Sequence, residues 1–422
     1  MKITAFAQAG YRAFPDDFEQ HHDSSVTTPW SLVDRSLMRT VYRDHLDNLM
    51  HAARRGFDGV AFTEHGQASY DMTPNPSLFG SALAYATECE GLTPAICPLG
   101  RSLGKSREPL RVAEEYAMID WMSGGRLVAG FPIGLPYDAC INNGVAPMEL
   151  RARFDENLAL VLRAWREDEP FSFNGRSTQL STVNIWPRPL QRPRPPVWLT
   201  GIGNPATMEM AFDHDFGFNY LSWFGTALTG PRIFDRFWDV AARRHAPQNP
   251  YRLGFVQTVG VAATDAEAER LYRPHVEYFF HKGPGAIPLE KLSIPGTVSP
   301  AGLQALMRDP RDLGLGAVLR TASFSELVDA GAVILGSPQT VSEQLAATIR
   351  RFHIGNVHLM LQFGSMPPEV ARGNIDLAAS DVLPALRSIW ADEHWEHHWW
   401  PESLGGRPLI ESAASPVAEG AR

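Results

Sequence analysis

The sequence has few cysteines, and this bounds the redox environment in which the chain folds. Its 422 residues include three of them, Cys89, Cys97 and Cys140. An odd number without paired spacing argues against a disulfide framework, and free thiols fit a reducing cytoplasm. The cysteines also lack ligand spacing, and no His-x-His motif follows the first predicted strand as a barrel metal-hydrolase would need. We therefore predict no metal site.

Long apolar runs and an excess of basic residues are also missing. No stretch approaches the roughly 20 apolar residues that a membrane helix needs. The apolar residues 1–8 are too few for the core of a signal peptide and are better interpreted as a strand. The formal net charge is −9, whereas a nucleic acid or an acidic membrane calls for a basic surface. We expect a globular protein whose ligand is a small molecule.

The sequence does contain a repeated alternation of short apolar segments and helical patterns. After residues 1–8, further strands are predicted at residues 60–62, 93–98, 127–131, 197–200, 219–223, 254–262 and 357–363. The clearest helical stripe follows the fourth strand, where apolar residues recur at helical spacing over residues 150–165. The alternation runs about eight times without a break in composition. It favours one α/β domain, a (β/α)8 barrel over residues 1–391, rather than two domains.

Some segments fall outside this alternation. A hairpin is predicted around Asn174 and Gly175, and the Gly- and Pro-rich residues 283–325 are a candidate lid among the insertions at the carboxyl face of the barrel. Residues 392–422 are expected to form a flexible tail. Their histidines and tryptophans resemble a metal or aromatic cluster, but an exposed or docked terminus is the better interpretation of His394, His397 and His398.

The stretch Gly56-Phe57-Asp58-Gly59-Val60-Ala61-Phe62-Thr63-Glu64-His65 places two ionisable residues at the end of a buried strand. Gly56 suits the left-handed turn that closes a helix. Residues 60–62 are apolar enough for a parallel strand covered on both faces. Ligands bind at the carboxyl ends of such strands, so His65 and Glu64 are candidate catalytic residues. Alternatively, His65 packs under a loop, and Glu64 orients it or caps that loop.

Gly201-Ile202-Gly203-Asn204-Pro205-Ala206-Thr207 follows another predicted strand and opens a helix. Backbone amides and a helix dipole at such a junction favour an anion without any lysine. A simple tight turn is the alternative, but the strand-to-helix context favours a phosphate site.

Five stretches together resemble the bacterial luciferase-like, flavin-dependent monooxygenases. They are GFDGVAFTEH (56–65), PLRVAEEYAMIDWMSGGRL (109–127), IWPRPLQRPRPPVW (185–198), GNPATMEMA (203–211) and ILGSPQTVSEQL (334–345). The resemblance spans residues 1–390. It implies a TIM barrel, usually a homodimer, that reacts reduced FMN with O2 and receives the reduced FMN from a separate flavin reductase.

The resemblance also assigns residues by position. His65 corresponds to the family's active-site histidine, beside Glu64, and Leu99-Gly100 to a non-proline cis peptide under the flavin ring. The phosphate-binding loop corresponds to Gly201, Gly203, Asn204, Ala206 and Thr207. Two positions depart from the family pattern. Gly66 stands where many relatives have a second histidine, and Ile133 where relatives have an arginine for the phosphate. Apart from the resemblance, Arg101, Lys105 and Arg107 are typical of a solvated loop, although they lie on the correct face to meet a phosphate.

The resemblance implies a two-component monooxygenase that oxygenates a small organic substrate, by carbonyl oxidation, Baeyer–Villiger insertion or hydroxylation. Two alternatives remain. One is a deazaflavin-dependent enzyme of the same fold that transfers a hydride. The other is a non-catalytic flavin-binding relative, which the changes at Gly66 and Ile133 keep open.

Overall fold

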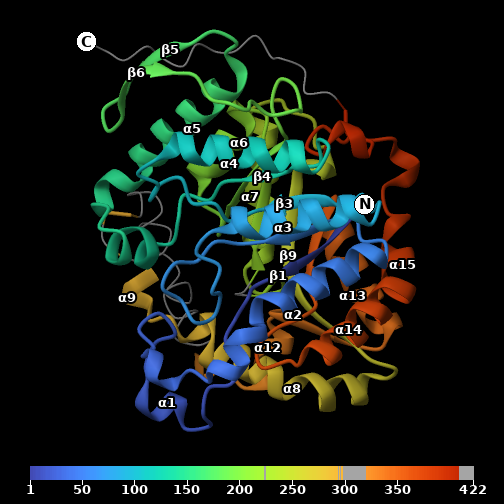
Figure 1. Ribbon diagram of the computed structural model, residues 1–422. Coiled ribbons are helices and arrows are strands. Elements are labelled where there is room, and N and C mark those ends of the chain that lie inside the picture. Colours follow the sequence, from blue (N-terminus) through green and yellow to red (C-terminus); the bar gives the residue numbers. More distant parts are fainter. Residues whose placement is uncertain (223–224, 293, 295, 298–319, 408–422) are drawn as a thin grey trace.

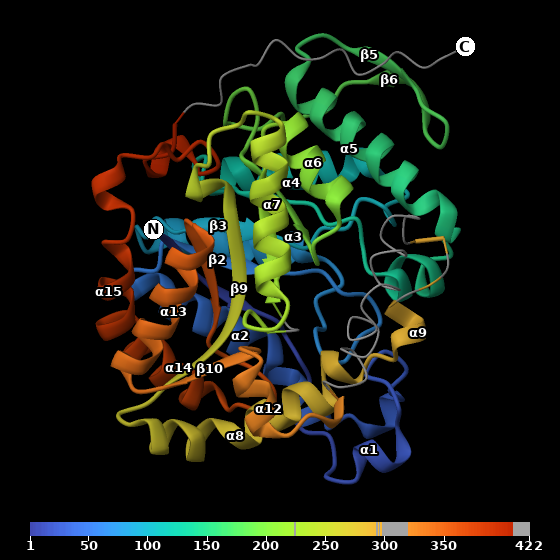
Figure 2. The same cartoon turned by 180° about the vertical axis from the view of Figure 1, so that it is seen from behind.

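The computed structural model describes residues 1–222, 225–292, 294, 296–297 and 320–407. Eight parallel strands form a barrel surrounded by helices (Figures 1 and 2). In their order around the barrel the strands are β1 (Lys2–Ala7), β2 (Gly59–Phe62), β3 (Ala95–Pro98), β4 (Ala129–Gly130), β7 (Val197–Gly201), β8 (Gly217–Leu221), β9 (Leu253–Val261) and β11 (Asn356–Met360). A parallel bridge between Ile96 and Leu127 joins β3 to the start of the fourth strand and closes the circle.

The helices cover the outside of this barrel (Figure 1). They are α1 (Phe18–His21), α2 (Arg35–Arg54), α3 (Pro76–Cys89), α4 (Pro109–Met122), α5 (Leu150–Arg166), α6 (Pro205–Asp213), α7 (Gly230–Arg243), α8 (Asp265–Lys282), α9 (Leu289–Leu292), α12 (Phe324–Asp329), α13 (Pro338–Phe352), α14 (Pro368–Leu377) and α15 (Leu383–Arg387). Because helices cover the outer face and side chains fill the interior, β2 and β9 are buried along their whole length. The predicted α/β barrel is confirmed.

Two strands of the barrel leave space for large side chains by carrying glycine. A Cβ atom at Gly217 would lie 2.5 Å from the Trp198 ring, and one at Gly254 would lie 2.2 Å from Asn219 Oδ1. These side chains belong to a buried layer inside the barrel, in which His358 Nε2 lies 2.9 Å from Asn219 Oδ1. Burial lowers the pKa of His358 to about 3, so this layer is held together by neutral hydrogen bonds.

Several local predictions can be compared with the structure. The hairpin is present as β5 (Phe171–Asn174) and β6 (Gln179–Val183). An additional strand, β10 (Val333–Gly336), was not predicted, and it pairs with the far end of β9. Of the predicted lid, residues 293, 295 and 298–319 lie outside the described residues.

Residues 392–407, which we assigned to the tail, pack across the amino ends of the barrel strands. Trp399 and Trp400 are buried. Trp198 Nε1 donates to the Trp399 carbonyl at 2.9 Å, and Asn249 Nδ2 donates to the Glu396 carbonyl at 2.8 Å. The His397 ring packs against the Tyr251 ring at an interplanar angle of 32°. This part of the chain is a docked terminus, while residues 408–422 lie outside the described residues. No helix in the described ranges is long and apolar enough to cross a membrane.

Candidate active site

Glu64 and His65 lie just beyond β2, at the carboxyl end of the barrel. Both are buried, with 7% of each residue exposed. The helix before them, α2, starts at Asp34, whose side chain accepts from Ser36 N at 2.8 Å, and the chain turns at Gly56 with φ +85°. The backbone N–H of His65 donates to the Thr73 carbonyl at 3.1 Å, which ties the strand end to the loop that follows. The predicted position of both residues is confirmed.

A cluster of charges surrounds Glu64. The ammonium of Lys105 lies 2.9 Å from Glu64 Oε1 and 2.5 Å from Asp138 Oδ2. Ser102 N donates to Glu64 Oε2 at 3.0 Å, and Arg101 Nη1 lies 3.6 Å from the same oxygen. Burial raises the pKa of Glu64, although the two cations act against it. Burial also disfavours the charged lysine, but the two carboxylates outweigh burial and raise the pKa of Lys105.

His65 is part of a buried chain of aromatic hydrogen-bonding groups. Its Nδ1 lies 2.8 Å from the Tyr70 hydroxyl, which lies 2.7 Å from the Tyr137 hydroxyl. Burial, assisted by Lys105, lowers the pKa of His65 to about 3. A fully buried imidazole of this kind stays neutral. Sequence reasoning missed both tyrosines because neither is part of a motif. Tyr70 lies in an irregular loop, and Tyr137 begins the short helical segment Tyr137–Asn142.

Leu99 and Gly100 follow β3, as predicted. Among the described residues the cis peptide bonds are Trp186–Pro187 and Arg192–Pro193, so the Leu99–Gly100 bond is trans and the cis peptide that the resemblance implies is absent. The trans form is the ordinary one for a non-proline residue, where cis costs about 3 kcal/mol. Gly100 is nevertheless required, because a Cβ atom there would lie 2.4 Å from Glu64 N. The Leu99 carbonyl accepts from Thr200 Oγ1 at 3.0 Å.

The predicted phosphate loop joins β7 to α6. Gly203 has φ +99°, and a Cβ atom there would lie 2.9 Å from Ile233 Cγ1. Asn204 caps α6 and binds two N–H groups of its first turn. Asn204 Oδ1 accepts from Ala206 N at 3.0 Å, and the Asn204 carbonyl accepts from Thr207 N. Within the described part of the chain, the backbone N–H groups of Gly203 and Asn204 donate no hydrogen bond. These two amides remain available to an anion.

Two arginines that sequence reasoning missed contact this loop. Arg151, from α5, donates through Nη1 to Thr207 Oγ1 at 3.0 Å and through Nη2 to the Ala206 carbonyl at 3.3 Å. Arg236, from α7, donates to the Gly203 carbonyl at 3.2 Å. Arg101 and Lys105, by contrast, belong to the charge cluster at Glu64. Ile133 packs in a small apolar cluster with Leu150, the residue before Arg151.

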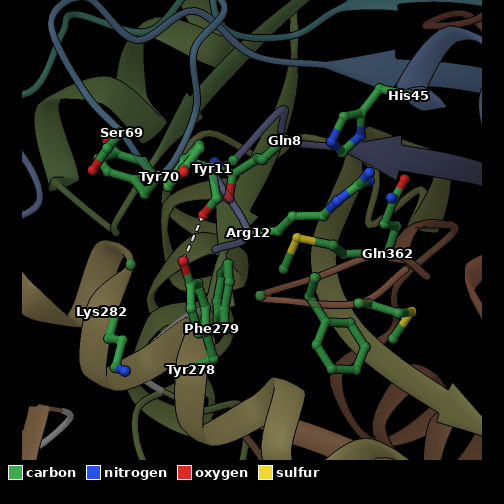
Figure 3. A pocket seen from close by; sticks show the side chains of 16 residues that line it. Gln8, Tyr11, Arg12, His45, Ser69, Tyr70, Tyr278, Phe279, Lys282 and Gln362 are labelled. Carbon is green, nitrogen blue, oxygen red and sulfur yellow. Dashed lines mark hydrogen bonds between the residues drawn. The ribbon is translucent and has the colours of Figure 1, made fainter. Parts of the chain in front are cut away.

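A small cavity opens at the same end of the barrel, between β1, α2, α8 and β11 (Figure 3). Tyr70 lines it, and Tyr70 also holds His65. Within the described residues no group of three or more His, Cys, Asp or Glu side chains could hold a metal ion. The mouth of the barrel thus combines a neutral histidine–tyrosine array, an anion-compatible loop and a cavity.

Comparison with known families identifies the chain. A family model described as "Luciferase-like monooxygenase" matches residues 20–353. The chain belongs to this family. An uncharacterised protein of Sinorhizobium fredii is 28% identical over 305 residues, which is 71% of this chain and 85% of the relative. The oxygenase component of a flavin-dependent trigonelline monooxygenase from Acinetobacter baylyi is 27% identical over 42% of this chain and 48% of its own length.

Solved structures of the same fold differ in their cofactors. The oxygenating constituent of the Pseudomonas putida 3,6-diketocamphane monooxygenase, in complex with FMN, has a TM-score of 0.63 at 19% identity and covers 91% of this chain and 98% of its own. An F420-dependent secondary alcohol dehydrogenase has a TM-score of 0.63 at 14% identity and covers 92% of this chain and 99% of its own. At these identities the likeness shows the TIM-barrel fold alone.

The tyrosine array predicts a stability effect. Tyr70→Phe removes the hydroxyl that contacts both His65 Nδ1 and the Tyr137 hydroxyl. We expect the free energy of unfolding to fall by about 1–3 kcal/mol, because buried polar groups lose their partner. Tyr85→Phe is the control, since Tyr85 is exposed on α3, and it should change stability by less than about 0.5 kcal/mol. Urea unfolding measures both. Equal stability of the two variants would contradict this view of the array.

Proposed function

We propose that this protein is the oxygenase component of a two-component flavin monooxygenase. A separate flavin reductase supplies reduced FMN. The reduced flavin provides two electrons to O2, so that one oxygen atom enters a small organic substrate and the other leaves as water. The observation that carries this proposal is the arrangement at the barrel mouth of a family member: a buried, neutral His65 near β2 and an anion-compatible loop after β7.

The loop after β7 has the donors that the FMN phosphate requires. Gly203 and Asn204 have backbone N–H groups that donate to no partner among the described residues. The Thr207 hydroxyl lies in the first turn of α6, and the Arg151 guanidinium contacts it from α5. Arg151, which also pairs with Asp155 on its own helix, supplies a guanidinium at the loop, whereas Ile133 has no charge. Charge-assisted hydrogen bonds of this kind contribute about 1.5–3 kcal/mol each. Leu99 and Gly100 lie between this loop and His65. The Leu99 carbonyl accepts from Thr200 on β7, and Gly100 runs close to Glu64 N.

His65 acts in this proposal as a fixed hydrogen-bonding group. If Tyr70 donates to Nδ1, the neutral ring carries its hydrogen on Nε2. In that arrangement the Tyr70 hydroxyl accepts from Tyr137, and both tyrosines are buried. Glu64 does not contact the ring through any described hydrogen bond; it is a positioning residue, tied to Lys105 and to Ser102 N. Burial of the whole array keeps water from the reacting atoms.

Oxygen tracing tests the proposed reaction. The protein is incubated with a purified NADH-dependent flavin reductase, NADH, FMN, 18O2 and a small-molecule extract, and products are found by mass spectrometry. We expect a compound that gains one 18O atom only when the protein is present. His65→Ala should slow its formation by about 100-fold or more, as for loss of an acid–base or hydrogen-bonding group.

His21→Ala is the matched control, because His21 is an exposed histidine on α1, and it should retain the wild-type rate. Absence of any labelled product would contradict the monooxygenase proposal. Wild-type labelling by His65→Ala would remove His65 from the chemistry.

The assembly belongs to the same proposal. The helices α3 and α4 pack side by side and expose large apolar side chains, Leu78 and Tyr85 on α3 and Met118 and Trp121 on α4. A second copy of the chain is the partner that we propose for this face, in the reducing cytoplasm that the free thiols fit.

Light scattering should therefore give the mass of a dimer for the wild type and of a monomer for Leu78→Glu/Trp121→Glu. The two charges would be buried without partners in the interface. A monomeric wild type would contradict this assembly.

A further inference from the structure

The cavity beside Tyr70 is lined by two cationic side chains and, among the described residues, by no acidic one. Its lining consists of Gln8, Gly10, Tyr11, Arg12, His45, Ser69, Tyr70, Tyr278, Phe279, Lys282, Gly283, Met360, Gln362, Phe363, Gly364 and Met366 (Figure 3). The protein as a whole has a formal net charge of −9. A cavity with positively charged side chains at the mouth of a negatively charged protein points to an acidic ligand.

Arg12, which forms an ion pair with Asp44, is the cationic side chain of the cavity that keeps N–H donors for such a ligand. Within the described part of the chain its guanidinium makes one hydrogen bond, from Nη2 to Asp44 Oδ2 at 3.0 Å. A guanidinium has five N–H donors in a planar fork, so most of them remain uncommitted. The Lys282 ammonium is already engaged, because it donates to the Pro15 carbonyl at 2.8 Å. Arg12 is therefore the group that can bind a carboxylate.

Two neutral polar side chains of the cavity have atoms without a partner. Gln8 Oε1 and His45 Nδ1 are buried and accept or donate no hydrogen bond among the described residues. The Gln8 amide is oriented by Thr63, whose hydroxyl donates to Asp71 and so can only accept from Gln8 Nε2. Burial lowers the pKa of His45 to about 4, so the ring adds no charge. Buried polar atoms without partners indicate a site that a polar ligand or water completes.

The position of the cavity separates it from the proposed phosphate loop. In the order of strands around the barrel, β1 lies four steps from β7, on the opposite side of the mouth. The cavity lies at the end of β1, and Tyr70 connects it to His65 through a 2.8 Å contact. A molecule held here would lie beside the candidate chemistry without competing for the loop after β7.

We propose that this cavity binds the carboxylate group of the substrate, with Arg12 as its charged partner, so that the substrate is a small organic acid. That the bound acid is a substrate rests on the proposed function, whereas the binding of a carboxylate in this cavity does not. The cavity volume of about 20 Å3 holds a terminal group or one water molecule rather than a whole ligand. The apolar side chains of Met360, Met366 and Phe279 then contact the carbon atoms next to the carboxylate.

Propionate and propionamide test this proposal, because they have the same shape and differ in charge. Dissociation constants are measured on the full chain without flavin, by ligand-observed NMR at constant ionic strength. We expect propionate to bind about tenfold or more tightly than propionamide, as for one charge-assisted hydrogen-bonded pair. Arg12→Gln should remove this preference, and Arg12→Lys, which keeps the charge without the fork, should retain part of it.

Two control variants locate the binding site. Arg111→Gln removes an exposed arginine that pairs with Glu108 and should leave propionate binding unchanged. Arg151→Gln alters the anion-compatible loop after β7 and shows whether propionate binds there instead. Equal binding of the two probes by the wild type would overturn the proposal and leave a cavity that holds only water. Loss of propionate binding in Arg151→Gln, with normal binding in Arg12→Gln, would also overturn it.

If Arg12→Gln does not fold, the wild-type preference and the Arg12→Lys value still decide the outcome. The result is independent of the proposed oxygenation. A lost carboxylate preference with normal 18O labelling would overturn this site alone, whereas a normal preference without labelling would overturn the monooxygenase proposal alone.

Discussion

Lys105 places its ammonium between two buried carboxylates, those of Glu64 and Asp138, at 2.9 and 2.5 Å. The three residues come from the loops that follow β2, β3 and β4, so one cation joins three neighbouring loops of the barrel mouth. Removing one partner of such a buried pair costs on the order of 3–5 kcal/mol, because the other charge is left without compensation. Gly66 is part of this constraint. A Cβ atom there would lie 2.9 Å from Asp138 Oδ1, so a larger residue would displace the cluster.

The same constraint determines the chemistry that is open to His65. The cluster fixes the end of β2, and burial together with the Lys105 charge keeps the imidazole neutral. A neutral ring held by Tyr70 and Tyr137 offers a fixed donor or acceptor rather than a group that gains a proton near neutral pH. The mouth thus provides directed hydrogen bonds from buried side chains, which suits the oxygen chemistry that we propose.

The sequence was sufficient to predict the barrel, the positions of Glu64 and His65 at the end of a strand, and the loop at Gly201. These features depend on local patterns, namely strand–helix alternation, glycine at turns and polar residues at strand ends. It was not sufficient to predict the contact of Arg151 with Thr207, which lies 56 positions later in the chain. Nor did it predict the contact between Tyr70 and Tyr137, which are 67 positions apart. Such contacts follow from how helices and loops pack, and no spacing in the chain encodes them. Trp399 was assigned to a tail for the same reason, because its partner Trp198 lies on a distant strand.

An anaerobic titration of reduced cofactors tests most directly whether this barrel uses FMN with its phosphate at the loop after β7. Reduced FMN, reduced riboflavin and reduced F420 are each titrated into the wild type, Arg151→Gln and the control Arg163→Gln, which changes an arginine farther along α5. The wild type should bind FMN most tightly, about tenfold or more above riboflavin, since one charge-assisted bond of about 1.5–3 kcal/mol is involved. Arg151→Gln should bring FMN close to riboflavin, and Arg163→Gln should not. Tighter binding of F420 than of FMN, or an FMN affinity that does not depend on Arg151, would contradict the proposed cofactor and its site.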